Sequence, residues 1–132
     1  MSGVYAYFEE NSVVIGNDYI ERRFSTENNR LITKEIVNKR AGKLIKFKPS
    51  SAEFVVALKK KKFLGYSTTF LSSNNLQIDN VNVFKHRVEF IFKPCIYNGA
   101  KISFIETVQI EEDNHYMHKY IEMVVAPEEQ HL

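Results

Sequence analysis

The segment from Val88 to Ile110 constrains the fold most, because apolar and polar side chains alternate along it. Its apolar set is Val88, Phe90 and Phe92, followed by Ile102, Phe104, Val108 and Ile110. Asn98-Gly99, between the two halves, is a strong signal for a two-residue type I′ turn. A period of two with such a turn predicts an antiparallel hairpin with one buried face.

Short strands separated by turn residues are expected in the rest of the chain as well. A three-strand meander is predicted from Tyr19–Ser25, Leu31–Asn38 and Leu44–Phe47. A further strand from Tyr116 to Val125 follows a turn at Glu112–Asn114, and the polar tail from Pro127 is expected to fray.

The stretch from Ser50 to Leu64 is ambiguous. Ser50-Ser51-Ala52-Glu53 fits the S-x-x-E capping box of a helix N-terminus. The alternation of Phe54, Val56 and Leu58, and the β-branched pair Val55-Val56, favour extended structure instead. We expect a strand here.

Composition agrees with a single all-β domain over residues 1–132. Ten Phe, seven Tyr and no Trp favour pleated structure, and a chain of 132 residues can bury a core without disulfides or metals. Closely spaced turn signals predict an antiparallel β-sandwich. Cys95 is the single cysteine and is expected to be an inert, buried thiol.

Charge and hydropathy argue against several partners. Eighteen basic and 16 acidic residues give a formal net charge of +2, which requires no nucleic-acid partner. No segment reaches the ~20 apolar residues of a membrane-spanning helix, so no membrane partner is expected. The N-terminus lacks the pattern of a secretory signal, which leaves the localisation of a longer parent protein open. No glycine-rich phosphate loop or other cofactor motif is present, so no cofactor is expected.

Glu106 interrupts the apolar row of the predicted hairpin. It could be an inward carboxylate with catalytic or ligand chemistry, but a catalytic pair needs a second carboxylate that sequence does not place. The favoured interpretation is a bulge or edge position where Glu106 reaches water, or a partner Lys or Arg.

Two further groups have ordinary structural explanations beside functional ones. His115 and His118 are three residues apart, which on a strand places them on opposite faces, so no metal site is expected. Lys59–Lys62, with Phe63 and Tyr66 after it, could contact phosphates. A solvated loop or a lysine-guarded edge strand is favoured.

Several flat side chains could contact carbohydrate. Tyr66, Tyr97, Tyr116 and Tyr120 could form a stacking platform for sugar rings, and His118 is a further candidate contact. The alternative is that these residues form the amphipathic rim of a sandwich core. Without knowing which face each occupies, the sequence leaves both open.

A longer pattern resembles a known family. Its parts are Ile15–Ser25 (IGNDYIERRFS), Leu31–Thr33 (LIT), Asn38–Gly42 (NKRAG), Ser51–Val55 (SAEFV) and His118–Met123 (HKYIEM). In this order they resemble the N-terminal β-sandwich of α-galactosidase-type (melibiase) glycoside hydrolases.

The resemblance implies a galactose-mutarotase-like supersandwich that precedes a catalytic (β/α)₈ barrel in a longer parent protein. The catalytic carboxylates of that family lie in the barrel, so it implies no catalytic residue in this chain. The chain would be a non-catalytic accessory domain that packs on the barrel and contacts sugar. Two alternatives are an intracellular lipid-binding-type β-barrel carrier and a weak nucleic-acid-binding domain that uses Lys59–Lys62.

Overall fold

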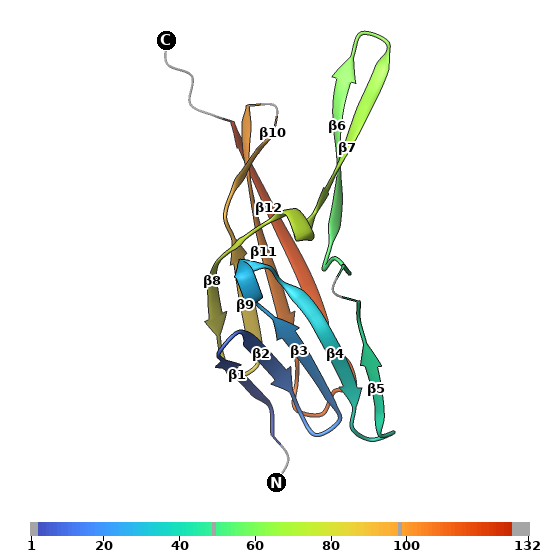
Figure 1. Cartoon of the computed structure of the whole chain (residues 1–132), viewed down its shortest axis with the longest axis vertical. Helices are drawn as coiled ribbons and strands as arrows, with labels where there is room; N and C mark the ends of the chain where they lie inside the picture. Colours follow the sequence, from blue (N-terminus) through green and yellow to red (C-terminus); the bar gives the residue numbers. More distant parts are fainter. Residues whose placement is uncertain (1–2, 49, 98, 128–132) are drawn as a thin grey trace.

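The computed structural model describes residues 3–48, 50–97 and 99–127, and this part of the chain is all β. Figure 1 shows strands in two main sheets and a projecting hairpin. The sheets are antiparallel and do not close into a barrel, so the predicted sandwich class is confirmed. Within the described ranges, no helix is long and apolar enough to span a bilayer.

The first sheet is a five-stranded meander in chain order. Its strands are β1 (Tyr5–Glu9), β2 (Ser12–Gly16), β3 (Ile20–Ser25), β4 (Ile32–Asn38) and β5 (Lys43–Lys46). A bulge shifts the β3–β4 register between Arg23 and Phe24, so that Arg23 pairs with Glu35 but Phe24 pairs with Thr33. The predicted meander is therefore confirmed, and the bulge keeps Phe24 and Thr33 on the same face.

The second sheet contains the predicted hairpin. Its strands are β8 (Ile78–Val83), β9 (Arg87–Phe92), β10 (Cys95–Tyr97), β11 (Ala100–Gln109) and β12 (His118–Pro127). β11 is central, because β12 pairs with one of its edges while β9 and β10 share the other. Tyr97 pairs with Ala100, which confirms a two-residue hairpin connection. Asn98 lies outside the described residues, and Gly99 has a positive φ of 74°.

The core lies between the two sheets and is rich in phenylalanine. Phe24 of β3 and Phe90 of β9 are both fully buried, and their ring centroids lie 4.9 Å apart across the interface. Phe54 extends the cluster, with ring contacts of 5.7 Å to Phe92 and 5.3 Å to Phe104. The alternating residues of the hairpin thus face inward as predicted, and aromatic packing joins the sheets.

A third, two-stranded sheet forms a hairpin that we call the arm. It consists of β6 (Val55–Lys62) and β7 (Gly65–Ser72), so the ambiguous stretch after Phe54 is a strand, as expected. A 3₁₀ turn, η2 (Ser73–Asn75), follows it, as η1 (Glu27–Asn29) follows β3. In Figure 1 the arm extends away from the sandwich and ends in a free tip.

Asn17, in the turn between β2 and β3, ties the first sheet to the loop before β12. It is fully buried, and its Nδ2 donates to the carbonyl oxygens of Glu111 (2.9 Å), Glu112 (3.3 Å) and Asn114 (2.8 Å). Its Oδ1 accepts from the backbone N–H groups of Tyr19 (2.8 Å) and Ile20 (3.0 Å). One amide therefore shapes its own turn and anchors a loop more than 90 residues away in the sequence.

Phe90→Ala should lower the free energy of unfolding by about 3–5 kcal/mol, because it leaves a large cavity at the centre of the sheet interface. Urea denaturation followed by circular dichroism measures this. Phe63→Ala at the arm tip is the matched control and should shift stability by about 0.5 kcal/mol or less, since the ring is fully exposed. Equal losses in the two variants would contradict the assignment of the core.

Candidate functional site

Three flat side chains lie in a row at the start of β12, and we call them the aromatic row: Tyr116, His118 and Tyr120. The ring centroids of Tyr116 and His118 are 5.1 Å apart, and those of His118 and Tyr120 are 6.0 Å apart and nearly parallel. Tyr116 is 56% exposed and Tyr120 49%. Because Lys119 and Ile121 of the same strand face the interior, the row lies on the outer face of the second sheet.

Polar side chains flank the aromatic row on the same outer face. Gln109 lies opposite His118, and Thr107 lies opposite Tyr120. One strand further, Arg87 lies opposite Gln109 and Glu89 opposite Thr107. Residues directly opposite on antiparallel strands share a face, so amide, guanidinium and carboxylate groups adjoin the rings, whereas the Thr107 side chain between them is buried. Exposed flat rings with hydrogen-bonding groups beside them are chemically suited to the apolar face and the hydroxyls of a sugar.

Tyr66 and Tyr97 do not join the aromatic row. Tyr66 lies on β7 near the arm tip, where it pairs with Lys61. Tyr97 lies at the other end of the second sheet, and its hydroxyl donates to Thr69 Oγ1 of the arm at 3.3 Å. Ala100, its strand partner, pairs with Pro127, which is nine residues along β12 from His118. That separation is ~30 Å. Of the four predicted sugar contacts, the structure therefore brings Tyr116 and His118 together and leaves Tyr66 and Tyr97 apart from them.

A buried ionic cluster lies between the sheets, centred on Glu53. Arg22 Nη2 of β3 lies 3.0 Å from Glu53 Oε1, and Arg22 also donates to Thr33 Oγ1 from Nε (3.1 Å) and Nη2 (2.7 Å). The Thr33 hydroxyl donates to Glu53 Oε2 at 2.6 Å. Lys119 Nζ of β12 donates to the Glu53 carbonyl oxygen and lies 3.9 Å from Glu53 Oε1 and 4.0 Å from Glu106 Oε1.

Glu106 is the unusual member of this cluster. It lies on the central strand β11 and is fully buried, and its carboxyl oxygens accept no hydrogen bond from another described residue, whereas its protonated carboxyl donates one to Glu53. Burial and the adjacent negative charge of Glu53 raise the pKa of Glu106 to about 9. Burial opposes ionisation of Glu53 too, but the Glu106 carboxyl, Arg22 and Thr33 hold the Glu53 pKa below its usual value.

Two carboxyls with divergent pKa values are typical of a general acid and its partner, but this pair does not suit catalysis. The Glu106 side chain has no exposed surface and that of Glu53 has 4%, so a substrate cannot reach them without separating the sheets. The predicted bulge or edge position for Glu106 is wrong, because β11 is paired on both sides there. The predicted lysine partner is present as Lys119.

A second polar cluster lies on the outer face of the first sheet. Tyr5 Oη donates to Glu21 Oε1 and accepts from Lys39 Nζ, both at 2.6 Å, and Arg23 Nε donates to Glu21 Oε2 at 2.7 Å. Burial and the Glu21 carboxylate raise the Tyr5 pKa above its usual value, which makes the phenol a poor nucleophile. Both Glu21 oxygens are occupied, so the cluster binds the strands to one another.

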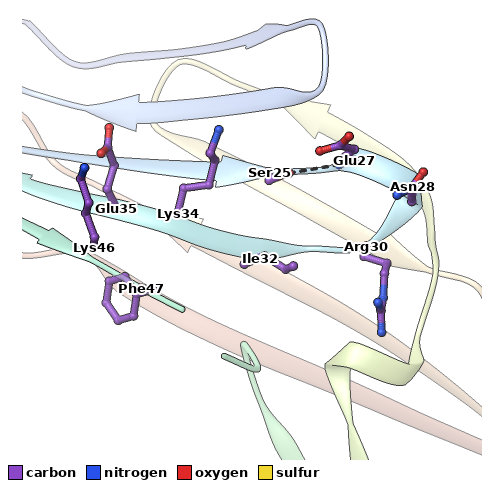
Figure 2. Close-up of a pocket in the computed structure, with 9 residues that line it drawn as sticks. All are labelled: Ser25, Glu27, Asn28, Arg30, Ile32, Lys34, Glu35, Lys46 and Phe47. Carbon is purple, nitrogen blue, oxygen red and sulfur yellow. Dashed lines mark hydrogen bonds between the residues drawn. The ribbon is translucent and has the colours of Figure 1, made fainter. Parts of the chain in front are cut away.

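An open groove runs beside η1 and the strands β3 to β5 and has a volume of about 530 Å³. Figure 2 shows Lys34, Glu35 and Lys46 pointing to one side of the strands and Arg30 and Phe47 to the other. The Arg30 guanidinium is already held by the Asn74 carbonyl at 2.8 Å. Because these groups diverge, the groove is a weaker candidate for a binding site than the flat face around the aromatic row.

The histidines, the cysteine and the lysine run that the sequence offered as candidate functional residues occupy separate places in the fold. The His115 ring contacts Tyr19 in a tilted arrangement, with ring centroids 4.2 Å apart, whereas His118 belongs to the aromatic row. No three His, Cys, Asp or Glu side chains gather into a metal site within the described ranges. Cys95 is half-buried, and burial raises the pKa of its thiol. The run Lys59–Lys62 lies on β6, an edge strand of the two-stranded arm.

Comparison with known proteins adds no relative: no family model, curated protein or solved structure matches the chain.

Sequence reasoning missed the partners of Glu106. In the sequence, Glu53 stands out only as the last residue of the S-x-x-E capping box. Arg22 falls on the same face as Ile20 and Phe24, which does indicate an inward arginine that needs a buried anion. The identity of that anion depends on how the loop before β6 crosses between the sheets, and spacing does not specify such a path.

Glu106→Gln should change how stability depends on pH. The carboxyl pKa is about 9 in the folded chain and about 4.3 when unfolded, so unfolding releases a proton between these values. Wild-type stability therefore falls by up to about 1.4 kcal/mol per pH unit from this group as pH rises. The variant lacks this slope, so its free energy of unfolding should rise relative to wild type from about pH 5 to about pH 8. Urea denaturation at a series of pH values measures the unfolding free energy of both proteins, and parallel plots of that free energy against pH would refute the prediction. Glu122→Gln, at an exposed position, serves as control.

Arg22→Met should destabilise the fold by about 3–5 kcal/mol, because it leaves the buried Glu53 carboxylate without its main cation. Arg87→Met is the control, since the Arg87 side chain is 45% exposed and that of its partner Glu89 29%, against 14% for Arg22 and 4% for Glu53. Removal of such an exposed pair should cost about 1 kcal/mol or less. Urea denaturation measures both variants. A similar loss of unfolding free energy in the two would show that the buried cluster contributes no more to stability than an exposed ion pair does.

Proposed function

We propose that this chain is a non-catalytic β-sandwich accessory domain of a carbohydrate-active, α-galactosidase-like enzyme, and that the aromatic row contacts carbohydrate. The observation that carries the proposal is the exposed row of Tyr116, His118 and Tyr120 on an open sheet face, flanked by Gln109 and Arg87. The sequence resemblance to melibiase-type sandwiches supports the enzyme class. The rings provide stacking surfaces, and the polar neighbours provide partners for sugar hydroxyls.

Exposed apolar side chains at the base of the arm and the adjoining end of the second sheet support docking on a larger domain. Val55 (58% exposed) and Phe70 (69%) share one face of the arm, and Ile96 and Val124 (both 59%) share the outer face of the second sheet near its end. Clustered exposed hydrophobic residues mark interaction surfaces. A catalytic barrel domain of the parent protein is the partner that the resemblance implies.

Burial of the Glu53–Glu106 carboxyl pair between the sheets supports an accessory role, because a substrate cannot reach the two groups. The lipid-carrier alternative is disfavoured, because a carrier of that type needs a closed barrel and these sheets stay open.

Binding to galactose-containing polysaccharide should slow migration of the domain in native affinity gels. Tyr120→Ala should weaken that binding by about fivefold, since one aromatic contact contributes about 1 kcal/mol. Tyr66→Ala removes an exposed tyrosine outside the row and is the matched control. Equal losses in both variants, or no retardation of the wild-type domain, would refute the proposed sugar contact.

The non-catalytic assignment has its own test. The purified domain should not hydrolyse aryl α-galactosides. Turnover that survives Tyr120→Ala but disappears in Glu106→Gln would show instead that the buried carboxyl pair becomes accessible and acts on substrate.

A further inference from the structure

The tip of the arm exposes two large apolar side chains next to each other. Phe63 is 100% exposed and Leu64 89% exposed, and together they form the turn between the paired residues Lys62 and Gly65. Gly65 adopts the positive φ of 92° that ends this turn. The tip projects freely in Figure 1. Two such residues at the end of a projecting hairpin have no folding role, because no described residue covers them.

Basic and aromatic side chains lie directly behind the tip. Lys61 pairs with Tyr66 across the two strands, and both side chains are exposed. Lys59, one step further on the same face, is exposed as well. Residues 55–72 contain four lysines and no acidic residue. Since the whole chain has a net charge of +2, the remainder carries 2 − 4 = −2, so the arm is the cationic part of a slightly anionic protein.

The order of these groups along the arm matches the depth profile of a membrane surface. Lys61 and Tyr66 lie two or three residues behind the tip, which is ~7–10 Å at the rise of a β-strand. Apolar groups of interfacial proteins reach ~5–10 Å into the boundary between headgroups and acyl chains. Tyrosine and lysine favour the headgroup level just above that boundary. Ser67 and Thr68 continue the arm into water.

We propose that the arm tip binds the surface of an anionic phospholipid bilayer, with Phe63 and Leu64 inserted below the headgroups and Lys59 and Lys61 beside the lipid phosphates. The sequence argument against a membrane partner concerned spanning segments, and a surface-bound tip needs none. A nucleic acid is less suited, because Leu64 offers no ring on which a base can stack. An acidic protein is less suited too, because acidic groups would pair with the lysines but would not account for the exposed apolar pair at the tip.

Co-sedimentation of the full chain with vesicles tests the proposal. The protein should bind vesicles made of equal parts phosphatidylcholine and phosphatidylserine, and it should bind pure phosphatidylcholine vesicles much less. Lys61→Gln should lower the partition coefficient about fivefold, because each lysine near an anionic surface contributes about that factor. Raising the salt concentration should weaken binding in the same direction.

The double variant Phe63→Ser, Leu64→Ser should abolish most of the vesicle binding while its thermal unfolding stays unchanged. Phe8→Ser is the matched control, since Phe8 is 52% exposed on β1, away from the arm. It should bind vesicles as wild type does. This readout is independent of the polysaccharide gels, because the tip and the aromatic row share no residue, so each proposal can fail separately.

Three results would overturn the proposal. Equal binding to neutral and anionic vesicles would remove the role of the lysines. Absence of sedimentation with anionic vesicles would remove membrane binding altogether. Lipid-free self-association or oligonucleotide binding that is lost in the Phe63→Ser, Leu64→Ser variant, with no vesicle binding in wild type, would assign the tip to another class of partner.

Discussion

The carboxylate of Glu53 joins three parts of the chain that strand pairing alone does not join. It receives Arg22 and Thr33 from the first sheet and Lys119 from the second. Glu53 itself belongs to the linker that enters the arm. The backbone N–H groups of Glu53 and Phe54 both donate to Ser73 Oγ, at 2.8 and 3.2 Å. Ser73 directly follows β7, where the chain leaves the arm. Both ends of the arm are thereby fixed to the sandwich at one place.

Such a cluster specifies geometry more than it adds stability. Desolvation of a buried ion pair can exceed the Coulombic gain, and apolar replacements are often at least as stable. Glu106 adds a second carboxyl beside Glu53, but its raised pKa keeps it protonated at neutral pH, so it donates a hydrogen bond to Glu53 without adding a buried charge. What the cluster provides is a single relative placement of two sheets whose phenylalanine interface would tolerate several. We regard this as the reason for ionic groups in a core that is otherwise apolar.

The sequence predicted local features well and long-range ones poorly. The alternation around Phe90 and Phe104, the meander and the strand after Phe54 were all predicted from periodicity, because inward and outward faces differ in polarity. The break between β9 and β10 was not expected, nor was the arm's departure from the sandwich. The separation of Tyr66 and Tyr97 from Tyr116 could not be foreseen, since residues that look equivalent in sequence lie at opposite ends of a long strand.

The hydrogen bonds of Asn17 have a kinetic consequence for the face that carries the aromatic row. They hold the backbone of Glu111 and Asn114, and the ring contact between His115 and Tyr19 holds the next residue. The segment that leads into Tyr116 is therefore set before any ligand arrives. A ligand would select an existing surface rather than shape one. Its association rate should be set by diffusional encounter, and ligands should differ mainly in their dissociation rates.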